Sequence, residues 1–570
     1  MSFIFFLLEL IPMRKAFFII SFSVLFLPIF ALAANIGDNQ AFNIESAYDA
    51  TNRDQVTATV RKLSNSAYFY FDDSWWTGLS ADQQSQVLLA LNSVGEEFDS
   101  RIYPILSQSF GEIWNPGIDR DSRIVILFHP MKETAGGYFN SADEYLKTQL
   151  PKSNEKEMIY INANQVTSSL LKSLIAHEFQ HLITFNQKER LRGIIEDTWL
   201  NEARSEYGLT VLGYDSPYAG SNLEKRVKSF LDKPYDSLTE WKGQSSDYGV
   251  VNIFIQYLVD HYGLAVLKDS LLSSKVGIDS LNETLKKQGS GDTFSQIFTT
   301  WTIAVFLNDC NFGQQYCYFN QSLRSFRVVP LANFLPPVPV TSLSVTNSTK
   351  DWGASWYKFF GAKGNLTLEF TGFAPGSSVF KIPYLLEDKQ KKYTLNFLEI
   401  NGSQKGKIDI TDFDKNYFSL IFIPSLQGKT TGFTSSEPSI QFSWTVSAAE
   451  ANTSPAEKPI SAGELLAKIE SLKKEIVRLQ NLLASLQQGS HILCQSFSQD
   501  LYYGMTNSQE VRCLQQFLNS KGVYLENLIT GNYFSLTVSA VKRYQALKGI
   551  IQTGYFGPLT RRAANLELNP

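Results

Sequence analysis

Residues 170–185 read LLKSLIAHEFQHLITF and contain the pattern His177-Glu178-Phe179-Gln180-His181. A helix turns once in 3.6 residues, so two histidines four positions apart lie on one face and can bind one metal ion. Glu178 follows the first histidine, where its carboxylate can reach a water rather than the metal. This is the HExxH pattern of zinc metalloproteases. Apolar residues at helical spacing predict a helix here. The pattern alone leaves open that both histidines are ordinary residues of a packed helix.

A second segment, DTWLNEARSEYG (197–208), carries two glutamates at helical spacing. A catalytic zinc ion keeps three protein ligands and one open position, so HExxH needs one more ligand. Asp197 can begin a short helix on which Glu202 and Glu206 share a face. We therefore assign Glu202 as the third ligand, and Glu206 to hold a ligand histidine in the correct tautomer. Without HExxH, a solvated helix face would be the better interpretation.

HEFQH followed by WLNEARSEYG resembles the gluzincin zinc peptidases, and particularly the hyicolysin family of secreted bacterial proteases. The resemblance extends upstream through residues 98–128 and 154–162 and covers about 45–265. It implies an α+β zincin-type domain with one catalytic Zn²⁺, in which a metal-activated water attacks the peptide bond.

The resemblance also implies the residue roles. His177, His181 and Glu202 hold the zinc, and Glu178 is the general base that passes the water's proton to the leaving amine. Glu206 matches the acidic position four residues after the third ligand.

The oxyanion formed during peptide hydrolysis needs a further hydrogen-bond donor. We choose Tyr248, at the start of the helical stretch 248–263, although most of the 26 tyrosines are expected only to pack. Tyr207 and His261 are the alternatives, and His261 lies near a helix end where the helix dipole accounts for it.

The amino terminus predicts export. Met13-Arg14-Lys15 forms a positive region, residues 16–30 are apolar, and Ala31-Leu32-Ala33 offers a cleavage site, so residues 1–33 are interpreted as a signal peptide whose true start is Met13. The apolar run is shorter than the roughly 20 residues that span a bilayer. An uncleaved anchor stays open.

Composition agrees with a folded, exported protein. Charged residues make up 19% of the 570 residues and the net charge is −4, which gives no reason to expect a nucleic-acid partner. The four cysteines predict two local disulfides in an oxidising compartment, Cys310–Cys317 and Cys494–Cys513. The acidic turn GIDRDSR (117–123) contains two aspartates, which without further ligands predict a turn rather than a calcium site.

The remaining chain divides by pattern. We assign 45–334 to the metallopeptidase domain, with strand-like runs and one helix up to residue 165 and mostly helices from 165 to 330. After the proline-rich segment 335–340, short alternating runs predict an all-β sandwich over 340–448, with adhesion, substrate positioning and spacing all open as roles.

A polar linker (449–462) leads to a short heptad pattern over 463–487, where isoleucine and leucine alternate at spacings of four and three. This favours a coiled coil that could form a homodimer, and a monomeric helical stalk stays open.

The last segment, 491–567, contains the near-repeat TGNYFSLTVSA and TGYFGPLTRRA. It resembles the small all-α peptidoglycan-binding domain of many cell-wall enzymes. Ser535 departs from that pattern, where a glycine usually follows the aromatic pair. The matching positions are Gly504, Val511, Leu514, Gln515, Phe517, Leu518, Gly531, Tyr544, Gln545, Gly557, Pro558 and Thr560. Most are core or turn residues, so they support the fold more than a glycan contact.

Together these features predict a secreted zinc endopeptidase, extracellular or held at a bacterial cell wall or envelope, that acts on proteins or peptides and binds peptidoglycan through 491–567. Two alternatives remain: a hydrolase of peptidoglycan stem peptides, and a wall-anchored adhesion or scaffold protein with a vestigial protease site.

Overall fold

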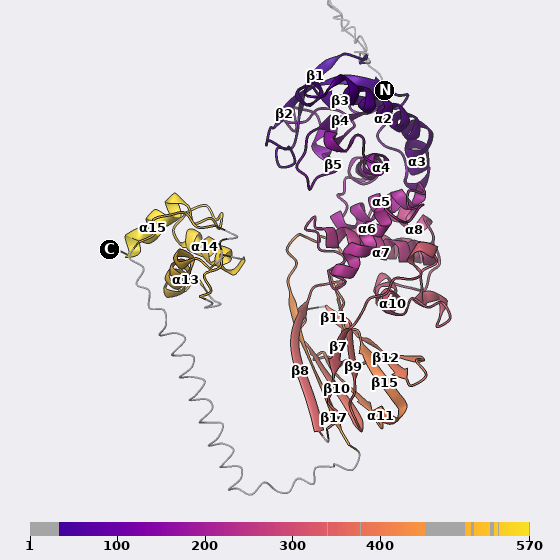
Figure 1. The fold of residues 1–570 in the computed structure, drawn as a ribbon, viewed down its shortest axis with the longest axis vertical. Coiled ribbons are helices and arrows are strands. Elements are labelled where there is room, and N and C mark those ends of the chain that lie inside the picture. The colour runs from indigo at the N-terminus through magenta and orange to yellow at the C-terminus, as the bar shows by residue number, and fades with distance from the viewer. Residues whose placement is uncertain are drawn as a thin grey trace, which may run out of the picture. The chain divides into compact units, whose positions relative to one another are not determined.

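The computed structural model forms two compact units, Met1–Ser454 and Pro455–Pro570 (Figure 1). It describes residues 34–450 except 339 and 377, and residues 496–568 except 503, 504, 506, 525–528 and 534. The predicted signal peptide (1–33), nearly all of the linker and the coiled-coil segment (463–487) lie outside the described residues.

The first part of unit 1 is a six-stranded mixed sheet in the order β1-β2-β3-β4-β6-β5. The strands β3, β4 and β6 run parallel, and β5 pairs antiparallel with β6 at the edge. The strand bounds are β1 (Asn39–Asn43), β2 (Gln55–Leu63), β3 (Ala67–Asp72), β4 (Ile124–His129), β5 (Gly137–Phe139) and β6 (Met158–Asn162). The three parallel strands are buried at every position, which explains their continuous apolar sequences.

Helices follow and cover this sheet, then continue as a helical layer, as predicted for 165–330 (Figure 1). The first group is α1 (Asp73–Thr77), α2 (Ala81–Glu97), η1 (Phe98–Ile102) and α3 (Tyr103–Phe110), with the short turns η2 (Ser141–Glu144) and η3 (Ala163–Gln165). The second is α4 (Leu171–Thr184), η4 (Phe185–Arg190), α5 (Thr198–Val211), α6 (Asn222–Asp232), α7 (Ser245–Tyr262), α8 (Ala265–Leu272), α9 (Gly277–Lys287), α10 (Phe294–Leu307), η5 (Gln314–Tyr316) and η6 (Gln321–Leu323). One apolar core joins the sheet to these helices.

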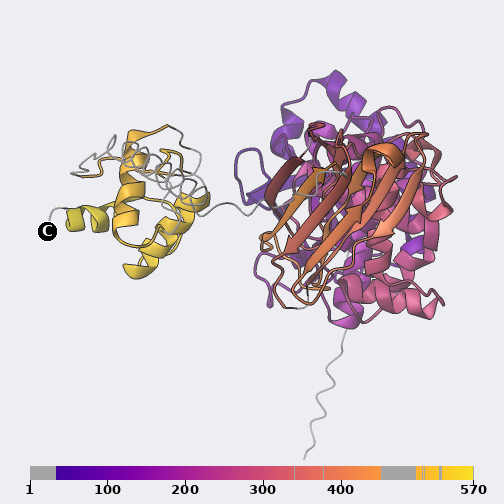
Figure 2. The same cartoon turned by 90° about the horizontal axis from the view of Figure 1, so that it is seen from below.

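A β-sandwich completes unit 1, and Figure 2 looks onto its strands. The sheet β14-β10-β17-β8 faces the sheet β13-β12-β15-β9-β7, and β11 pairs with β16. Trp444 of β17 meets Phe359 of β9 edge-on, with ring centroids 4.9 Å apart, so the two sheets share a core. The bounds are β7 (Leu331–Phe334), β8 (Val340–Thr349), β9 (Tyr357–Phe360), β10 (Asn365–Gly372), β11 (Val379–Lys381), β12 (Pro383–Asp388), β13 (Tyr393–Phe397), β14 (Lys405–Ile410), α11 (Phe413–Asn416), β15 (Tyr417–Phe422), β16 (Ser425–Gln427) and β17 (Ile440–Ala449).

The domain boundary predicted at 334–340 needs correction. Residues 331–334 form β7, which pairs in parallel with β9 and so belongs to the sandwich. In addition, Trp352 and Trp356 are buried in the same apolar cluster as the helical layer. The proline-rich segment therefore does not mark the boundary: the sandwich has its own core, and some residues that follow the segment pack into the core of the helical layer.

Unit 2 is a small helical domain with its own core, built from α13 (Gln509–Ser520), α14 (Ser535–Leu547) and α15 (Pro558–Leu568). The near-repeat has a structural counterpart. Gln515 accepts hydrogen bonds from the backbone N–H groups of Thr530 and Gly531, and Gln545 accepts one from Gly554. Each buried glutamine therefore holds one Thr-Gly turn.

Among the described residues, no one helix combines the length and apolar character needed to cross a membrane. The pair α7 and α8, bent by 104° at their break, meets that requirement together by length and composition alone.

Candidate metal centre

The helix α4 places both histidines of the HExxH pattern at the centre of unit 1. Its apolar side chains pack into the core, and it lies against β5 and β6 of the sheet and against α5. The imidazole rings of His177 and His181 lie 5.1 Å apart between centroids. Helical spacing has therefore brought them to one face, as predicted.

The helix α5 brings the third predicted ligand to the same place. Glu202 Oε2 lies 3.1 Å from His177 Nε2 and 3.8 Å from His181 Nε2. Zinc bonds of about 2.0–2.1 Å in tetrahedral geometry separate two ligand atoms by about 3.3 Å. The three donor atoms lie within 4.8 Å of one another, and they form the one such group found in the part of the chain that the structure describes. Two imidazoles and a carboxylate at these separations fit a zinc ion.

Glu178 lies beside this triangle, buried between α4 and the edge strand β5. A Cβ atom at Gly137 would come within 3.1 Å of Glu178 Oε1 and 2.7 Å of the Tyr160 carbonyl oxygen, so only glycine lets β5 approach this closely. Burial raises the pKa of Glu178 to about 7. The negative charges of Glu202 and Glu206 act in the same direction, whereas His177 acts to lower the pKa. A carboxylate with a pKa near neutrality suits a general base.

Glu206 lies under His177, fully buried, with its Oε1 3.5 Å from His177 Nδ1. Arg226 of α6 binds both carboxylate oxygens at 2.8 and 2.7 Å. Asn222 and Asn252 donate to Oε2 at 2.8 and 3.0 Å. Burial would raise the pKa of Glu206, but Arg226 outweighs it and holds the pKa at about 2. The ionised carboxylate can accept a hydrogen bond from Nδ1–H, which leaves Nε2 free for a metal.

His181 has different partners on its Nδ1 atom, and neither was identified from the sequence. Asn201 Oδ1 lies 3.1 Å away and Ser205 Oγ lies 3.3 Å away, both on α5. Because they flank Glu202 on one helix, their positions in WLNEARSEYG were the available signal.

Tyr248 lies at the start of α7 and contacts the centre. Its ring centroid is 6.2 Å from that of His177, Trp241 packs edge-on against it at 4.8 Å, and the Arg226 guanidinium lies over it at 4.4 Å. Burial raises its pKa, with Glu202 and Glu178 adding to the shift.

The two alternatives have other surroundings. His261 Nε2 lies 3.0 Å from the Cys317 carbonyl oxygen, near the end of α7. Tyr207 packs against the main apolar core, and burial raises its pKa.

One part of the chain is similar in sequence to a known protein. The chain is 25% identical over 283 residues to the "Neutral metalloprotease ShpI" of Staphylococcus hyicus. The chain is a distant homologue of this neutral metalloprotease. The match covers 45% of this chain and 59% of the relative, so it spans less than two thirds of the relative's length.

The C-terminal residues match a second family. Residues 507–564 match the family described as "Putative peptidoglycan binding domain". Among solved structures, a periplasmic inhibitor of g-type lysozyme from Aeromonas hydrophila, PliG, is 8% identical with a TM-score of 0.13, over 21% of this chain and 98% of that one. A likeness at that TM-score carries no argument about fold or function.

Tyr48 is a neighbour of the metalloprotease-like site that the sequence did not indicate. It stacks on Tyr138 of β5 at 4.8 Å and remains 43% exposed. Its pKa is raised by burial and by the charges of Glu178 and Glu202. It lies about 130 residues before HExxH in the chain, so no spacing could have signalled it.

One of the two predicted disulfides lies wholly within the described residues. Cys310 and Cys317 form the expected disulfide. Cys513 is also disulfide-bonded, and its predicted partner Cys494 lies outside the described residues.

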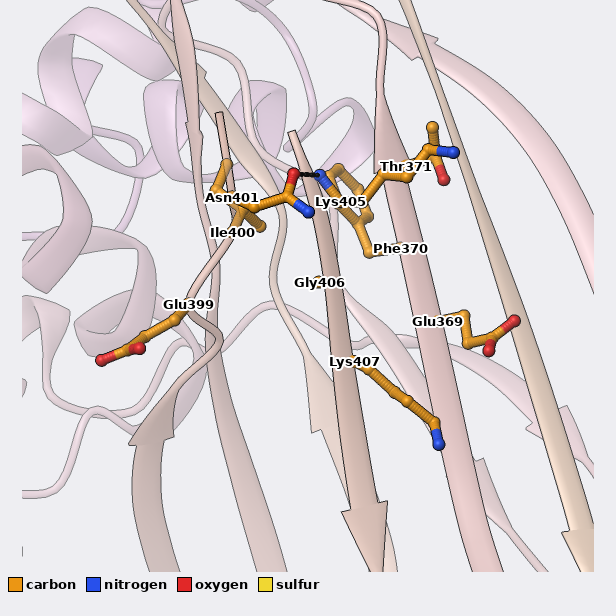
Figure 3. A pocket seen from close by; sticks show the side chains of 9 residues that line it. All are labelled: Glu369, Phe370, Thr371, Glu399, Ile400, Asn401, Lys405, Gly406 and Lys407. Atoms are coloured by element: carbon orange, nitrogen blue, oxygen red, sulfur yellow. Dashed lines mark hydrogen bonds between the residues drawn. The ribbon is translucent and has the colours of Figure 1, made fainter. Parts of the chain in front are cut away.

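A hollow of about 680 Å³ lies on the sandwich (Figure 3). It lies against β10, β14 and residues 399–401, where Asn401 Oδ1 accepts a hydrogen bond from the Lys405 backbone N–H. None of its lining residues belongs to α4 or α5.

Proposed function

We propose that this chain is a zinc-dependent endopeptidase whose metal is held by His177, His181 and Glu202. The observation that carries the proposal is the meeting of these three donors beside the buried carboxylate of Glu178. The distant likeness to a neutral metalloprotease supports it.

The chain's own residues divide the work of peptide hydrolysis. A bound zinc ion would supply Lewis-acid chemistry, acidifying water and polarising a carbonyl oxygen. Glu178 would accept a proton on its carboxylate and return it to the leaving amine. Glu206 would hold His177 with its Nε2 atom toward the metal, and Asn201 and Ser205 would orient His181.

Tyr248 is the proposed donor to the developing oxyanion. Packing against Trp241 and Arg226 fixes its ring, so little ordering would be needed during the reaction.

The C-terminal unit would attach the enzyme to peptidoglycan, and the predicted signal peptide would export it to the cell wall, the envelope or the medium. The support is the match of residues 507–564 to a peptidoglycan-binding family. The same match favours one second candidate function, cleavage of peptidoglycan stem peptides.

A test compares the full mature chain with Glu178→Gln, and with Glu133→Gln as a control that removes an exposed carboxylate. Zinc content, casein cleavage, release of peptides from purified peptidoglycan and co-sedimentation with insoluble peptidoglycan would be measured. We expect one zinc ion in all three proteins and casein cleavage lost only in Glu178→Gln. Peptide release from peptidoglycan without casein cleavage would favour the second candidate. Absence of zinc would contradict both and favour a scaffold protein.

A further inference from the structure

A second group of buried carboxylates lies apart from the proposed zinc ligands. Glu144 ends η2 and Glu157 directly precedes β6, and each is only 3% exposed. Both carboxylate oxygens of Glu144 and Oε2 of Glu157 have no hydrogen-bond partner. Among the described residues no ion pair reaches either side chain. Buried polar groups without partners are rare in folded proteins and call for a physical explanation.

The neighbouring acidic residues Asp143 and Asp119 have hydrogen-bond or ion-pair partners other than Glu144 and Glu157. Asp143 accepts from the Tyr160 hydroxyl at 2.6 Å and from the Asn154 backbone N–H at 2.8 Å. Asp119 binds the Lys156 ammonium at 2.9 Å. That lysine pairs with Asp119, and no ion pair joins it to Glu144 or Glu157.

The turn at 117–121 packs against Glu157. The Ile118 backbone N–H donates to Glu157 Oε1 at 2.7 Å. At Gly117, with φ +87°, a Cβ atom would lie 1.8 Å from Glu157 Oε2, so any other residue would displace that oxygen. The acidic turn therefore packs directly against the Glu157 carboxylate, a contact that the sequence did not show.

Two states could relieve the unpaired oxygens. The carboxyl groups of Glu144 and Glu157 interact with each other, so they could share one proton. A shared proton satisfies one oxygen on each group and leaves the third oxygen buried without a partner. A cation can contact several oxygens at once and also offsets both charges.

We propose that Glu144 and Glu157, with the 117–121 turn, bind a hard divalent cation of the Ca²⁺ class. Oxygen-only donors, flexible turns and excess negative charge are what Ca²⁺ selects, whereas zinc prefers nitrogen or sulfur donors. The site is independent of the proposed peptidase chemistry.

The cation would tie together three segments that support the edge strand. It joins the turn, η2 and the start of β6, and β6 pairs with β5, the strand that packs against Glu178. Bound Ca²⁺ would therefore stabilise the sheet edge beside the zinc ligands.

The test uses the full zinc-loaded chain, titrated with CaCl₂ by calorimetry in zinc-buffered solution. A Glu144→Gln/Glu157→Gln variant removes both charges, and Glu155→Gln removes a neighbouring carboxylate that is partly exposed and beside Lys147. We expect one Ca²⁺ per parent chain and per Glu155→Gln chain. In the double variant we expect affinity at least about tenfold weaker, since Ca²⁺ affinity follows ligand charge.

Thermal unfolding keeps the test decisive if the double variant is poorly folded. The parent should unfold at a higher temperature with Ca²⁺ than with the same concentration of Mg²⁺, and Glu144→Gln alone should remove that difference. The proposal is overturned if the parent binds no Ca²⁺ up to about 10 mM, above the weakest protein sites, or if parent and variants bind it equally. The first result would leave the shared proton as the explanation, and the second would place the bound Ca²⁺ elsewhere on the chain. Casein cleavage is not a readout, so failure of the peptidase proposal would leave this result unaffected.

Discussion

Arg226→Met is the most informative substitution near the metal centre, because Arg226 touches none of the proposed ligands. The substitution keeps the length and apolar character of the side chain but removes both hydrogen bonds to Glu206. The Glu206 carboxylate would remain buried at 0% side-chain exposure beside His177.

The contacts around Glu206 set the size of the effect. Removing one partner of a buried ion pair costs about 3–5 kcal/mol. Asn222 and Asn252 still donate to Glu206, so we expect about 3 kcal/mol, the lower end of that range. Glu206 orients a metal-binding histidine, and such a contact is worth about 10–100-fold in metal affinity. Because Arg226 holds Glu206 in place, its loss should weaken zinc binding by about that factor.

The assay pairs zinc affinity, by competition with a chelator, with chemical unfolding of the zinc-free protein. Lys225→Met is the control, since it removes an exposed cation one residue away on the same helix. Adding Glu206→Gln to Arg226→Met should recover about 1–3 kcal/mol of stability, because the unpaired charge is gone. The reasoning fails if Arg226→Met matches Lys225→Met in both measurements, or if the second substitution recovers nothing.

Three further predictions test other parts of the molecule. Tyr248→Phe should lower kcat on casein about 100-fold while zinc content is unchanged, as expected for loss of an oxyanion donor; an unchanged kcat would remove Tyr248 from the mechanism. Burial raises the pKa of Asp197 to about 6 from its ordinary value of 3.8, so the folded protein favours the protonated carboxyl. The resulting gain in folding free energy is complete below pH 4 and is lost as the pH rises through 6. Unfolding titrations should therefore show the parent losing about 2 kcal/mol relative to Asp197→Asn between pH 4 and 6.5, and parallel pH profiles would contradict the assignment. Gln515→Ala should destabilise unit 2 by about 3 kcal/mol, because the buried Gln515 amide holds the Thr530-Gly531 turn and its loss leaves the backbone N–H groups of that turn unpaired. Gln545→Ala should have an effect of the same size. A calorimetric scan in which the transition of unit 1 moves instead would refute this.

Sequence pattern predicted several of the strands whose burial is continuous or regularly alternating. AYFYF, RIVILF and MIYIN became β3, β4 and β6 because helices and strands cover both faces of the sheet there. β12 was missed because it begins with Pro383, which reads as a break although the first position of a strand tolerates proline. β7 was missed because it lies before the proline-rich segment that we took as the domain boundary.

The metal ligands could be predicted because helix geometry fixes their spacing within two short segments. Their supporting residues could not, because they come from other helices. Arg226 and Asn222 lie on α6, and Asn252 lies on α7. Such polar residues occur throughout the sequence, and only the folded chain shows that all three point at Glu206. Glu144 and Glu157 were missed for the same reason, since neither has a motif spacing.

The sandwich contacts also answer part of the question that the sequence left open about its role. The Gly432 backbone N–H donates to Asp197, the residue that begins the helix of Glu202, and the Trp241 backbone N–H donates to the Thr434 carbonyl oxygen. Trp241 in turn packs against Tyr248. One sandwich loop therefore contacts the supports of both the third ligand and the proposed oxyanion donor. A mere spacer would need neither contact, so these hydrogen bonds favour a role in positioning the centre.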